Sequence, residues 1–245
     1  MKTVVIVQAR MTSTRLPGKV MKEVLGRPLL SYQIERLRRI TSPCELVVAT
    51  TTNEADEPIA GLCAGLSVPV FRGPEDDVLS RYYHAAHEHG AGTVVRLTSD
   101  CPLIDPAIVD RAIAFYAVHN AGYDYVSNCL KRTYPRGMDT EVFSFGALET
   151  AFKEASEAHH REHVTSYIYA HPERFRLANV ACAQDLSRHR WTVDTPEDLR
   201  LIRRIIEALY PAMPEFTMED VLGLFERDEK LFLVNAHVEQ KKTGG

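Results

Sequence analysis

The feature that most constrains the fold is the alternation of short apolar runs with segments of helical spacing along the first half of the chain. The predicted strands are 3–8, 45–51, 68–71 and 93–98, and the predicted helices are 28–40, 57–66, 76–89 and 106–119. Strands and helices that alternate at this spacing are typical of a mostly parallel sheet covered by helices on both faces. The predicted fold class is therefore α/β, with right-handed crossovers.

The pattern is less regular after about residue 122. We predict strands at 123–127, 140–145, 175–180 and 190–193, a polar loop at 130–138, and helices at 145–157, 160–171, 196–209 and 218–226. Neither an internal repeat nor a low-complexity linker divides the chain. We expect one domain over 1–235, followed by a disordered tail at 236–245.

Composition excludes several classes of protein. The 245 residues are 45% hydrophobic and carry a formal net charge of −4, which argues against nucleic-acid binding through bulk positive charge. No run approaches the roughly 18 apolar residues of a membrane helix, so we expect a cytoplasmic protein without membrane insertion. The five cysteines are widely spaced and include no CxxC pair, so they predict neither a disulfide framework nor a cysteine zinc site.

A cationic loop follows the first predicted strand. Residues 5–19 read VIVQARMTSTRLPGK and place Arg10, Arg15 and Lys19 in one short segment. Gly18 permits close approach of the backbone to a ligand, and the cations suit a polyphosphate. The loop is not a Walker A motif, because Val20 follows Gly-Lys where Ser or Thr is required. The alternative is a solvated turn with incidental cations.

Two carboxylates follow apolar runs elsewhere in the chain. Asp100 lies in SDCPLIDP (99–106), and Asp194 lies in WTVDTPEDL (191–199). Ligands of such sheets bind beyond the carboxyl ends of the strands, and two carboxylates converging there suit Mg²⁺. The alternatives are structural: a helix N-cap for Asp194 and a turn former for Asp100.

A second metal pattern is weaker. The segment HHREH (159–163) places His159, Glu162 and His163 in the H-x-x-E-H order of one class of zinc protease. The chain has ten histidines and no distinctive downstream zinc-ligand motif, so chance explains this short pattern better than a zinc site.

The segment VIVQARMTSTRLPGKVMKEVLGRPLL closely resembles the opening of the CMP-sugar-acid synthetases, especially CMP-KDO synthetase (3-deoxy-manno-octulosonate cytidylyltransferase). Together, SDCPLIDP, YPRGMDTEVF, REHVTSYIY and RWTVDTPEDL resemble the spore coat polysaccharide biosynthesis protein F family over roughly residues 1 to 205. The resemblance implies a nucleotide-diphospho-sugar-transferase-like, Rossmann-like fold of the GT-A type, and a homodimer. It also implies that Arg10 and Lys19 contact a triphosphate and that Asp100 and Asp194 bind Mg²⁺.

One departure concerns the base. CMP-KDO synthetases carry a Gln-Gly-Asp-Glu-Pro type stretch where this chain has TSDCP at 98–102, so the aspartate is kept but the side chain that helps to read the base differs. The acceptor motif YPRGMDTEVF belongs to the second family only. The acceptor therefore need not be KDO or a sialic acid.

The leading hypothesis is Mg²⁺-dependent transfer of CMP from CTP to a sugar, sugar acid or sugar phosphate, in polysaccharide or glycoconjugate biosynthesis. Arg10, Lys19 and Asp100 are the expected catalytic residues. The expected nucleotide-binding residues are Gln8, Ala9, Arg10, Ser13, Arg15, Gly18, Lys19 and Ser99. The expected acceptor-binding residues are Arg136, Asp139, Glu141 and His163, and 123–175 is the expected acceptor and dimerisation region. The alternatives are a glycosyltransferase that uses a nucleotide sugar on this fold and a non-catalytic nucleotide-binding regulator.

Overall fold

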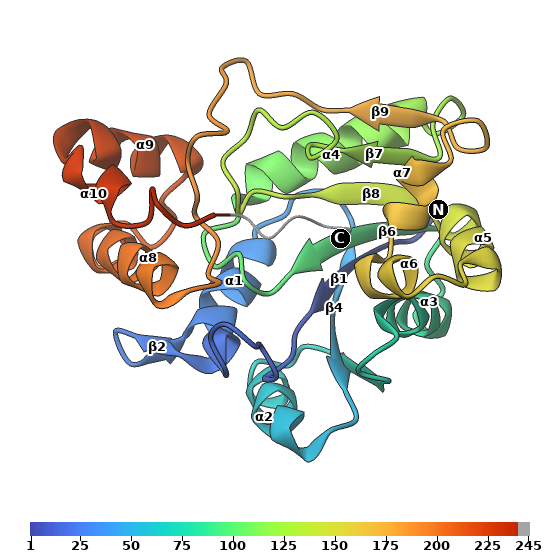
Figure 1. Ribbon diagram of the computed structural model, residues 1–245, viewed down its shortest axis with the longest axis horizontal. Coiled ribbons are helices and arrows are strands. Elements are labelled where there is room, and N and C mark those ends of the chain that lie inside the picture. The colour runs from blue at the N-terminus through green and yellow to red at the C-terminus, as the bar shows by residue number, and fades with distance from the viewer. Residues whose placement is uncertain (240–245) are drawn as a thin grey trace.

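The computed structural model describes residues 1–239, in which a seven-stranded sheet runs through the protein in the order β5-β4-β1-β6-β8-β7-β9 (Figure 1). The strands are β1 (Thr3–Gln8), β4 (Glu45–Thr51), β5 (Val70–Gly73), β6 (Thr93–Thr98), β7 (Tyr125–Ser127), β8 (Glu141–Ser144) and β9 (Leu177–Asn179). β1 lies parallel between β4 and β6, whereas β8 is antiparallel to both of its neighbours. The predicted mostly parallel α/β sheet is confirmed.

Helices cover both faces of the sheet. They are α1 (Leu29–Leu37), α2 (Glu57–Gly65), α3 (Val78–Glu88), α4 (Pro106–His119), α5 (Phe145–Glu154), α6 (Ala158–His163), α7 (Ser166–Ala170), α8 (Pro196–Leu209), α9 (Met218–Arg227) and α10 (Lys230–Leu233). Alternate β1 residues face opposite sides: Val5 packs with the α1, α2, α4, α8 and α9 side chains, and Val4 with those of α3, α5 and α7. Figure 1 shows α8, α9 and α10 on one side and α3, α5 and α6 on the other.

Helix starts follow their sequence signals closely. The Asp105 carboxylate caps α4 by accepting the Ala107 N–H at 2.9 Å, directly before Pro106. Thr195, and not Asp194, caps α8 through a capping box with Asp198. Asp194 therefore lies outside the helix, and its side chain is left for other contacts.

Several predicted elements differ from the structure. The predicted helix 160–171 is two short helices, α6 and α7, separated at Val164, whose φ of 54° is left-handed. The predicted strand 190–193 is not part of the sheet and makes only an isolated bridge between Arg190 and Arg136. The hairpin β2 (Glu23–Val24) and β3 (Arg27–Pro28) was not predicted.

The tail prediction is partly tested. Residues 236–239 are described, and the Val238 N–H donates to Asn235 O at 3.0 Å. The remainder, 240–245, lies outside the described residues. Within 1–239, none of the helices has the length and apolar character needed to cross a bilayer.

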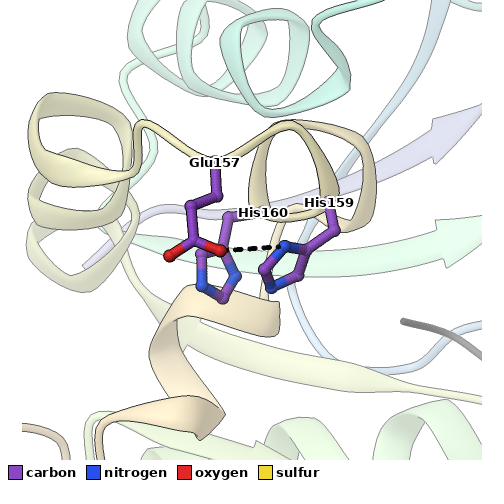
Figure 2. Close-up of side chains that lie close together, drawn as sticks. All are labelled: Glu157, His159 and His160. Carbon is purple, nitrogen blue, oxygen red and sulfur yellow. Dashed lines mark ion pairs between the residues drawn. The ribbon is translucent and has the colours of Figure 1, made fainter. Parts of the chain in front are cut away.

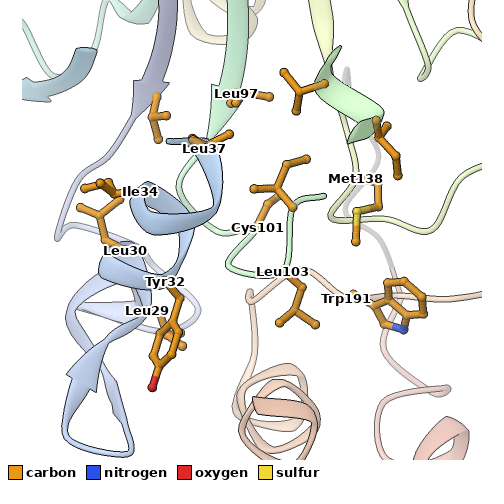
Figure 3. Packing of buried hydrophobic residues seen from close by; sticks show 14 of the residues in the cluster. Leu29, Leu30, Tyr32, Ile34, Leu37, Leu97, Cys101, Leu103, Met138 and Trp191 are labelled. Atoms are coloured by element: carbon orange, nitrogen blue, oxygen red, sulfur yellow. The ribbon is translucent and has the colours of Figure 1, made fainter. Parts of the chain in front are cut away.

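An apolar cluster supports the loops at the end of the central strands. Figure 3 shows α1 side chains facing Cys101 and Leu103 of the loop after β6, with Trp191 on the far side. Trp191 is fully buried, and the backbone beside it passes against Gly137. A Cβ at Gly137 would stand 2.6 Å from Trp191 O, so this close approach requires glycine.

Candidate active site

The cationic loop 9–19 leaves the carboxyl end of β1 and is held by backbone hydrogen bonds. The Met11 N–H donates to Asp56 Oδ1 at 2.7 Å, and the Gly18 N–H donates to Met11 O at 2.8 Å. Gly18 has a φ of 66°, a left-handed conformation that suits glycine. The loop leads into a single 3₁₀ turn at Lys19–Met21, which directs Lys19 toward the strand ends.

Lys19 lies between the two predicted metal-binding carboxylates. Its Nζ is 3.0 Å from Asp100 Oδ2 and 2.8 Å from Asp194 Oδ1. The three side chains come from segments separated by 81 and 175 residues. The lysine side chain is 13% exposed and the two carboxylates are 21% and 11% exposed, so all three face a largely enclosed space.

Asp194 reaches this position because its segment is bound to the loop after β6. The Val193 N–H donates to Asp100 O at 2.8 Å, and Thr192 Oγ1 donates to the same oxygen at 3.1 Å. The Trp191 N–H donates to Arg136 O at 2.8 Å. The 191–194 segment thus lies beside the strand end without joining the sheet.

A second group of charges lies directly behind Asp194. Arg190 donates through Nε to Asp198 Oδ1 at 2.9 Å and through Nη2 to Asp194 Oδ2 at 3.0 Å. Asp198 is fully buried and also accepts from Asn235 Nδ2 at 2.8 Å. Arg190, Asp198 and Asn235 were not predicted. The first two could have been noticed as charges within RWTVDTPEDL, whereas Asn235 carries no such signal.

Electrostatics keep Lys19 and Asp100 charged. Burial alone would lower the pKa of Lys19, but the charges of Asp100 and Asp194 raise it above its usual value. Burial would raise the pKa of Asp100, whereas the Lys19 charge and the hydroxyl of Thr98 lower it. At neutral pH Lys19 is therefore an ammonium and Asp100 a carboxylate.

A cavity of about 920 Å³ opens beside this group. Its lining includes three cations near the strand ends, Arg10, Arg15 and Arg96, together with Asp100 and Asp194. The predicted acceptor residues Arg136, Asp139 and His163 line the same cavity. The structure therefore brings three of the four predicted acceptor residues to one cavity with both predicted metal-binding carboxylates.

Not every predicted nucleotide-binding residue lines this cavity. Gln8 does, but Ala9, Ser13, Gly18 and Ser99 do not, and Lys19 meets the cavity only through the Asp100 and Asp194 carboxylates that line it. Ser99 is buried, and the Ala9 N–H donates to Ala49 O at 3.0 Å. These residues shape the backbone of the two loops, and their part in nucleotide binding stays a prediction.

A smaller cavity of about 350 Å³ adjoins the first and shares Arg96, Thr98, Asp139 and His163 with it. Its wall is formed by Glu141, which pairs with Arg96 and accepts hydrogen bonds from the hydroxyls of Tyr125 and Thr165, each at 2.6 Å. The remaining lining is apolar or aromatic: Leu97, Cys129, Leu130 and Tyr169. Arg96 was not predicted, because nothing in a strand sequence marks one charged residue as lining a cavity.

The residues of the H-x-x-E-H pattern do not form a metal group in the described part of the chain. Glu162 and His163 line the large cavity, whereas His159 Nδ1 lies 3.3 Å from Glu157 Oε2. The metal-ligating side chains that do gather in residues 1–239 are Glu157, His159 and His160, shown in Figure 2. The first two are exposed, and the Nδ1 atom of His160 is hydrogen-bonded to Ser166 Oγ at 2.9 Å.

Asp100 and Asp194 fit a divalent cation better than that cluster does. Their oxygens already hold one cationic atom between them at hydrogen-bonding distances. Carboxylate oxygens are the donors that Mg²⁺ and Mn²⁺ prefer, and the adjoining cavity leaves room for phosphate oxygens and water.

Comparisons with known proteins agree with this geometry. A family model described as "Cytidylyltransferase" matches residues 4–237. The spore coat polysaccharide biosynthesis protein SpsF of Bacillus subtilis is 30% identical over 230 residues, covering 91% of this chain and 93% of that protein. A solved cytidylyltransferase from Leptospira borgpetersenii has a TM-score of 0.91 at 30% identity and covers 99% of both chains.

A more distant structure shares the fold. A CMP:2-keto-3-deoxy-manno-octonic acid synthetase complexed with CTP superposes with a TM-score of 0.64 at 17% identity, over 85% of this chain and 99% of that one. Both predicted resemblances are confirmed, and the family match extends past residue 205 to include Asn235. The chain belongs to the cytidylyltransferase family and is a nucleotidyltransferase.

Proposed function

We propose that this enzyme transfers CMP from CTP to an oxygen of a sugar, sugar acid or sugar phosphate and releases pyrophosphate. The observation that carries the proposal is one cavity lined by three groups of side chains. They are the loop cations Arg10 and Arg15, the carboxylates Asp100 and Asp194, and the predicted acceptor residues Arg136, Asp139 and His163. A triphosphate lying along the loop would bring its α-phosphate between the carboxylates and the Arg136 side.

The loop cations compensate charge. When an acceptor oxygen attacks the α-phosphorus in line, the bond to the β-phosphate oxygen breaks and negative charge grows on pyrophosphate. Arg10 is paired only loosely, with its Nη1 3.7 Å from Glu75 Oε1. Arg15 pairs with Asp194 at 3.0 Å, but its side chain is 37% exposed. Both can exchange these partners for phosphates. Such a reaction needs positioning and charge compensation and no covalent nucleophile.

Asp100 and Asp194 would hold the divalent cation, which we propose to be Mg²⁺. A bound Mg²⁺ supplies positive charge to the phosphate oxygens of the nucleotide. The chain's contribution is to fix the two carboxylates: Thr98 Oγ1 donates to Asp100 Oδ1 at 2.6 Å, and Arg190 holds Asp194 Oδ2 at 3.0 Å.

The acceptor would lie between Arg136 and the smaller cavity. Asp139 is held by Arg132, whose Nη2 lies 2.8 Å from Asp139 Oδ2, and His163 borders both cavities. A sugar offers hydroxyls to these groups, and a carboxylate or phosphate on it would meet Arg136. Tyr125 and Tyr169 give the smaller cavity the aromatic surface that a sugar ring's C–H face can contact.

The test follows the α-phosphate. The enzyme is incubated with Mg²⁺, CTP labelled at the α-phosphate, and panels of sugars, sugar acids and sugar phosphates. The proposal predicts that the label appears in a CMP-linked product in a one-to-one ratio with pyrophosphate. Release of a nucleoside diphosphate from a nucleotide sugar, with no pyrophosphate from CTP, would contradict it and support glycosyl transfer.

We also expect a homodimer in the cytoplasm, with 123–175 at the contact. Sedimentation equilibrium at micromolar concentration tests the assembly, and a single monomeric species would refute it.

A further inference from the structure

The Lys19 ammonium occupies the position in which the two carboxylates would hold a metal ion. It contacts one oxygen of each, Asp100 Oδ2 and Asp194 Oδ1, at 3.0 and 2.8 Å. The family resemblance, however, implies that Lys19 contacts the triphosphate. The Lys19 side chain therefore has two positions, one between the carboxylates and one at the phosphates, and it cannot occupy both at once.

The other oxygens of the two carboxylates also have partners. Asp194 Oδ2 is 3.0 Å from both Arg15 Nη2 and Arg190 Nη2, and Asp100 Oδ1 accepts from Thr98 Oγ1. A cation that enters between the carboxylates must therefore displace an existing donor. Lys19 is the one at the centre, because it bridges both residues.

Charge balance opposes a metal ion without the nucleotide. Three cations, Lys19, Arg15 and Arg190, face three carboxylates, Asp100, Asp194 and Asp198, so the cluster is neutral. A divalent cation alone would add two uncompensated positive charges to a largely enclosed site, where repulsion is weakly screened. A nucleoside triphosphate brings the negative charge that removes this cost.

The three cations differ in how freely they can move. Arg190 is 8% exposed and contacts Asp198 through two nitrogen atoms, each at 2.9 Å. The Lys19 ammonium sits on a flexible four-carbon stem next to the left-handed Gly18 turn, and it contacts Asp100 and Asp194, which line the cavity. Lys19 can leave the carboxylates by side-chain rotation alone, whereas Arg190 cannot without uncovering Asp198.

We propose that Lys19 acts as an internal counter-cation that holds the metal position in the nucleotide-free enzyme. When a nucleoside triphosphate binds, its phosphates draw the ammonium away, so the divalent cation binds together with the nucleotide and not before it. This inference rests on the proposed function, because it assigns the triphosphate to the loop that carries Lys19. Lys19 is then both a phosphate ligand and the residue that prevents the divalent cation from binding before the nucleotide.

The experiment measures Mn²⁺ binding to the nucleotide-free protein by electron paramagnetic resonance of free Mn²⁺. Wild type should bind Mn²⁺ weakly, and Lys19→Met should bind it more tightly by a factor within the roughly 5–150-fold range typical of coupled sites. Lys22→Met is the matched control, because Lys22 lies three residues along the same segment and is not one of the cations that pair with Asp100, Asp194 or Asp198, so its loss should change nothing. Lys19→Gln, a second neutral variant, guards against misfolding of the first.

The second arm adds α,β-methylene-CTP and corrects for Mn²⁺ held by the free nucleotide. In wild type the analogue should strengthen Mn²⁺ binding, and in Lys19→Met this gain should shrink. Tight, saturable Mn²⁺ binding by nucleotide-free wild type, or equal affinity in wild type and both folded Lys19 variants, would overturn the inference. Failure of wild type to bind the analogue at all would instead overturn the proposed function, so the two failures are distinguishable.

Discussion

The loop end of the large cavity and the smaller cavity beside it both contain buried ion pairs, but the pairs are built differently. At the loop end, Lys19 bridges Asp100 and Asp194 from a flexible stem, and Arg15 reaches Asp194 from a side chain that is 37% exposed. In the smaller cavity, Glu141 is 7% exposed and accepts from Arg96, Tyr125 and Thr165. The loop pairs can be replaced by ligands, whereas the Glu141 pair holds the cavity wall.

This difference suggests how to distinguish charged residues that bind ligands from charged residues that stabilise the fold in adjoining cavities. A carboxylate whose donors come from mobile cations can exchange them for a metal ion and phosphates. Where hydroxyls and a residue of a neighbouring strand already satisfy a carboxylate, removing its charge lowers the stability of the fold. Changes at the loop end should therefore reduce turnover with little effect on folding, and changes at Glu141 should do the reverse.

The largest effect is expected for Asp194→Asn. The amide keeps the shape but removes the negative charge that would hold the divalent cation, so we expect kcat/KM to fall by at least about 10²–10³-fold while the fold persists. Steady-state kinetics across a Mg²⁺ titration checks this. Asp185→Asn, in an exposed turn, is the control. An unchanged Mg²⁺ dependence in Asp194→Asn would contradict the assignment.

Lys19→Ala should reduce activity somewhat less. Loss of one group that meets developing charge costs about 2.7–4 kcal/mol of transition-state stabilisation, or about 10²–10³-fold in kcat. Lys22→Ala provides the comparison within the same segment. Normal turnover by Lys19→Ala would show that Lys19 takes no part in the reaction and is purely a structural ion-pair partner.

Glu141→Gln tests the ion pair in the wall of the smaller cavity. It leaves the mostly buried Arg96 without its charge partner, and we expect the free energy of unfolding to fall toward the lower end of the ~3–5 kcal/mol seen when a buried pair is broken. Urea denaturation measures the loss. Glu154→Gln, which breaks the exposed pair with Arg174, should change stability much less. Full stability with abolished activity in Glu141→Gln would instead place Glu141 in contact with substrate.

At neutral pH the smallest effect is expected at His189, which is not part of either group of ion pairs. Burial, with a smaller contribution from the Arg188 charge, lowers the pKa of His189 to about 4. The unfolded chain therefore binds a proton that the folded chain rejects, and stability falls as pH drops from about 6.5 to 4, by at most ~1.4 kcal/mol per pH unit. Urea denaturation at several pH values should show this slope in wild type and a smaller one in His189→Gln. An identical slope in both would assign it to other groups.

Much of the fold followed from local patterns. β1, β4, β6, α4 and α8 have the predicted bounds because each combines a clear apolar period with a defined start, such as Pro106 after Asp105. The carboxylates Asp100 and Asp194 were expected to converge only if the predicted strands 93–98 and 190–193 lay close together in the sheet. They do meet, through Lys19, but 190–193 lies beside the strand end without joining the sheet, and the lysine between them was not foreseen.

The errors have tertiary causes. The predicted helix 160–171 breaks at Val164, where the next residue, Thr165, turns its hydroxyl to Glu141 of β8. The predicted strand 190–193 has the right apolar pattern, but its backbone binds Arg136 and Asp100 while Arg190 turns to Asp198. Neither long-range partner is visible in a local window of sequence.

The measurement that tests the central claim most directly is a thermal-shift panel of CTP, UTP, ATP, GTP and nucleotide sugars, each with and without Mg²⁺. A ligand at 100 times its Kd adds about 2.7 kcal/mol, which for a chain of this size raises Tm by about 5–10 °C. The account predicts a shift of this order for CTP that depends on Mg²⁺. A larger shift with a nucleotide sugar, or no shift with CTP and Mg²⁺, would contradict it.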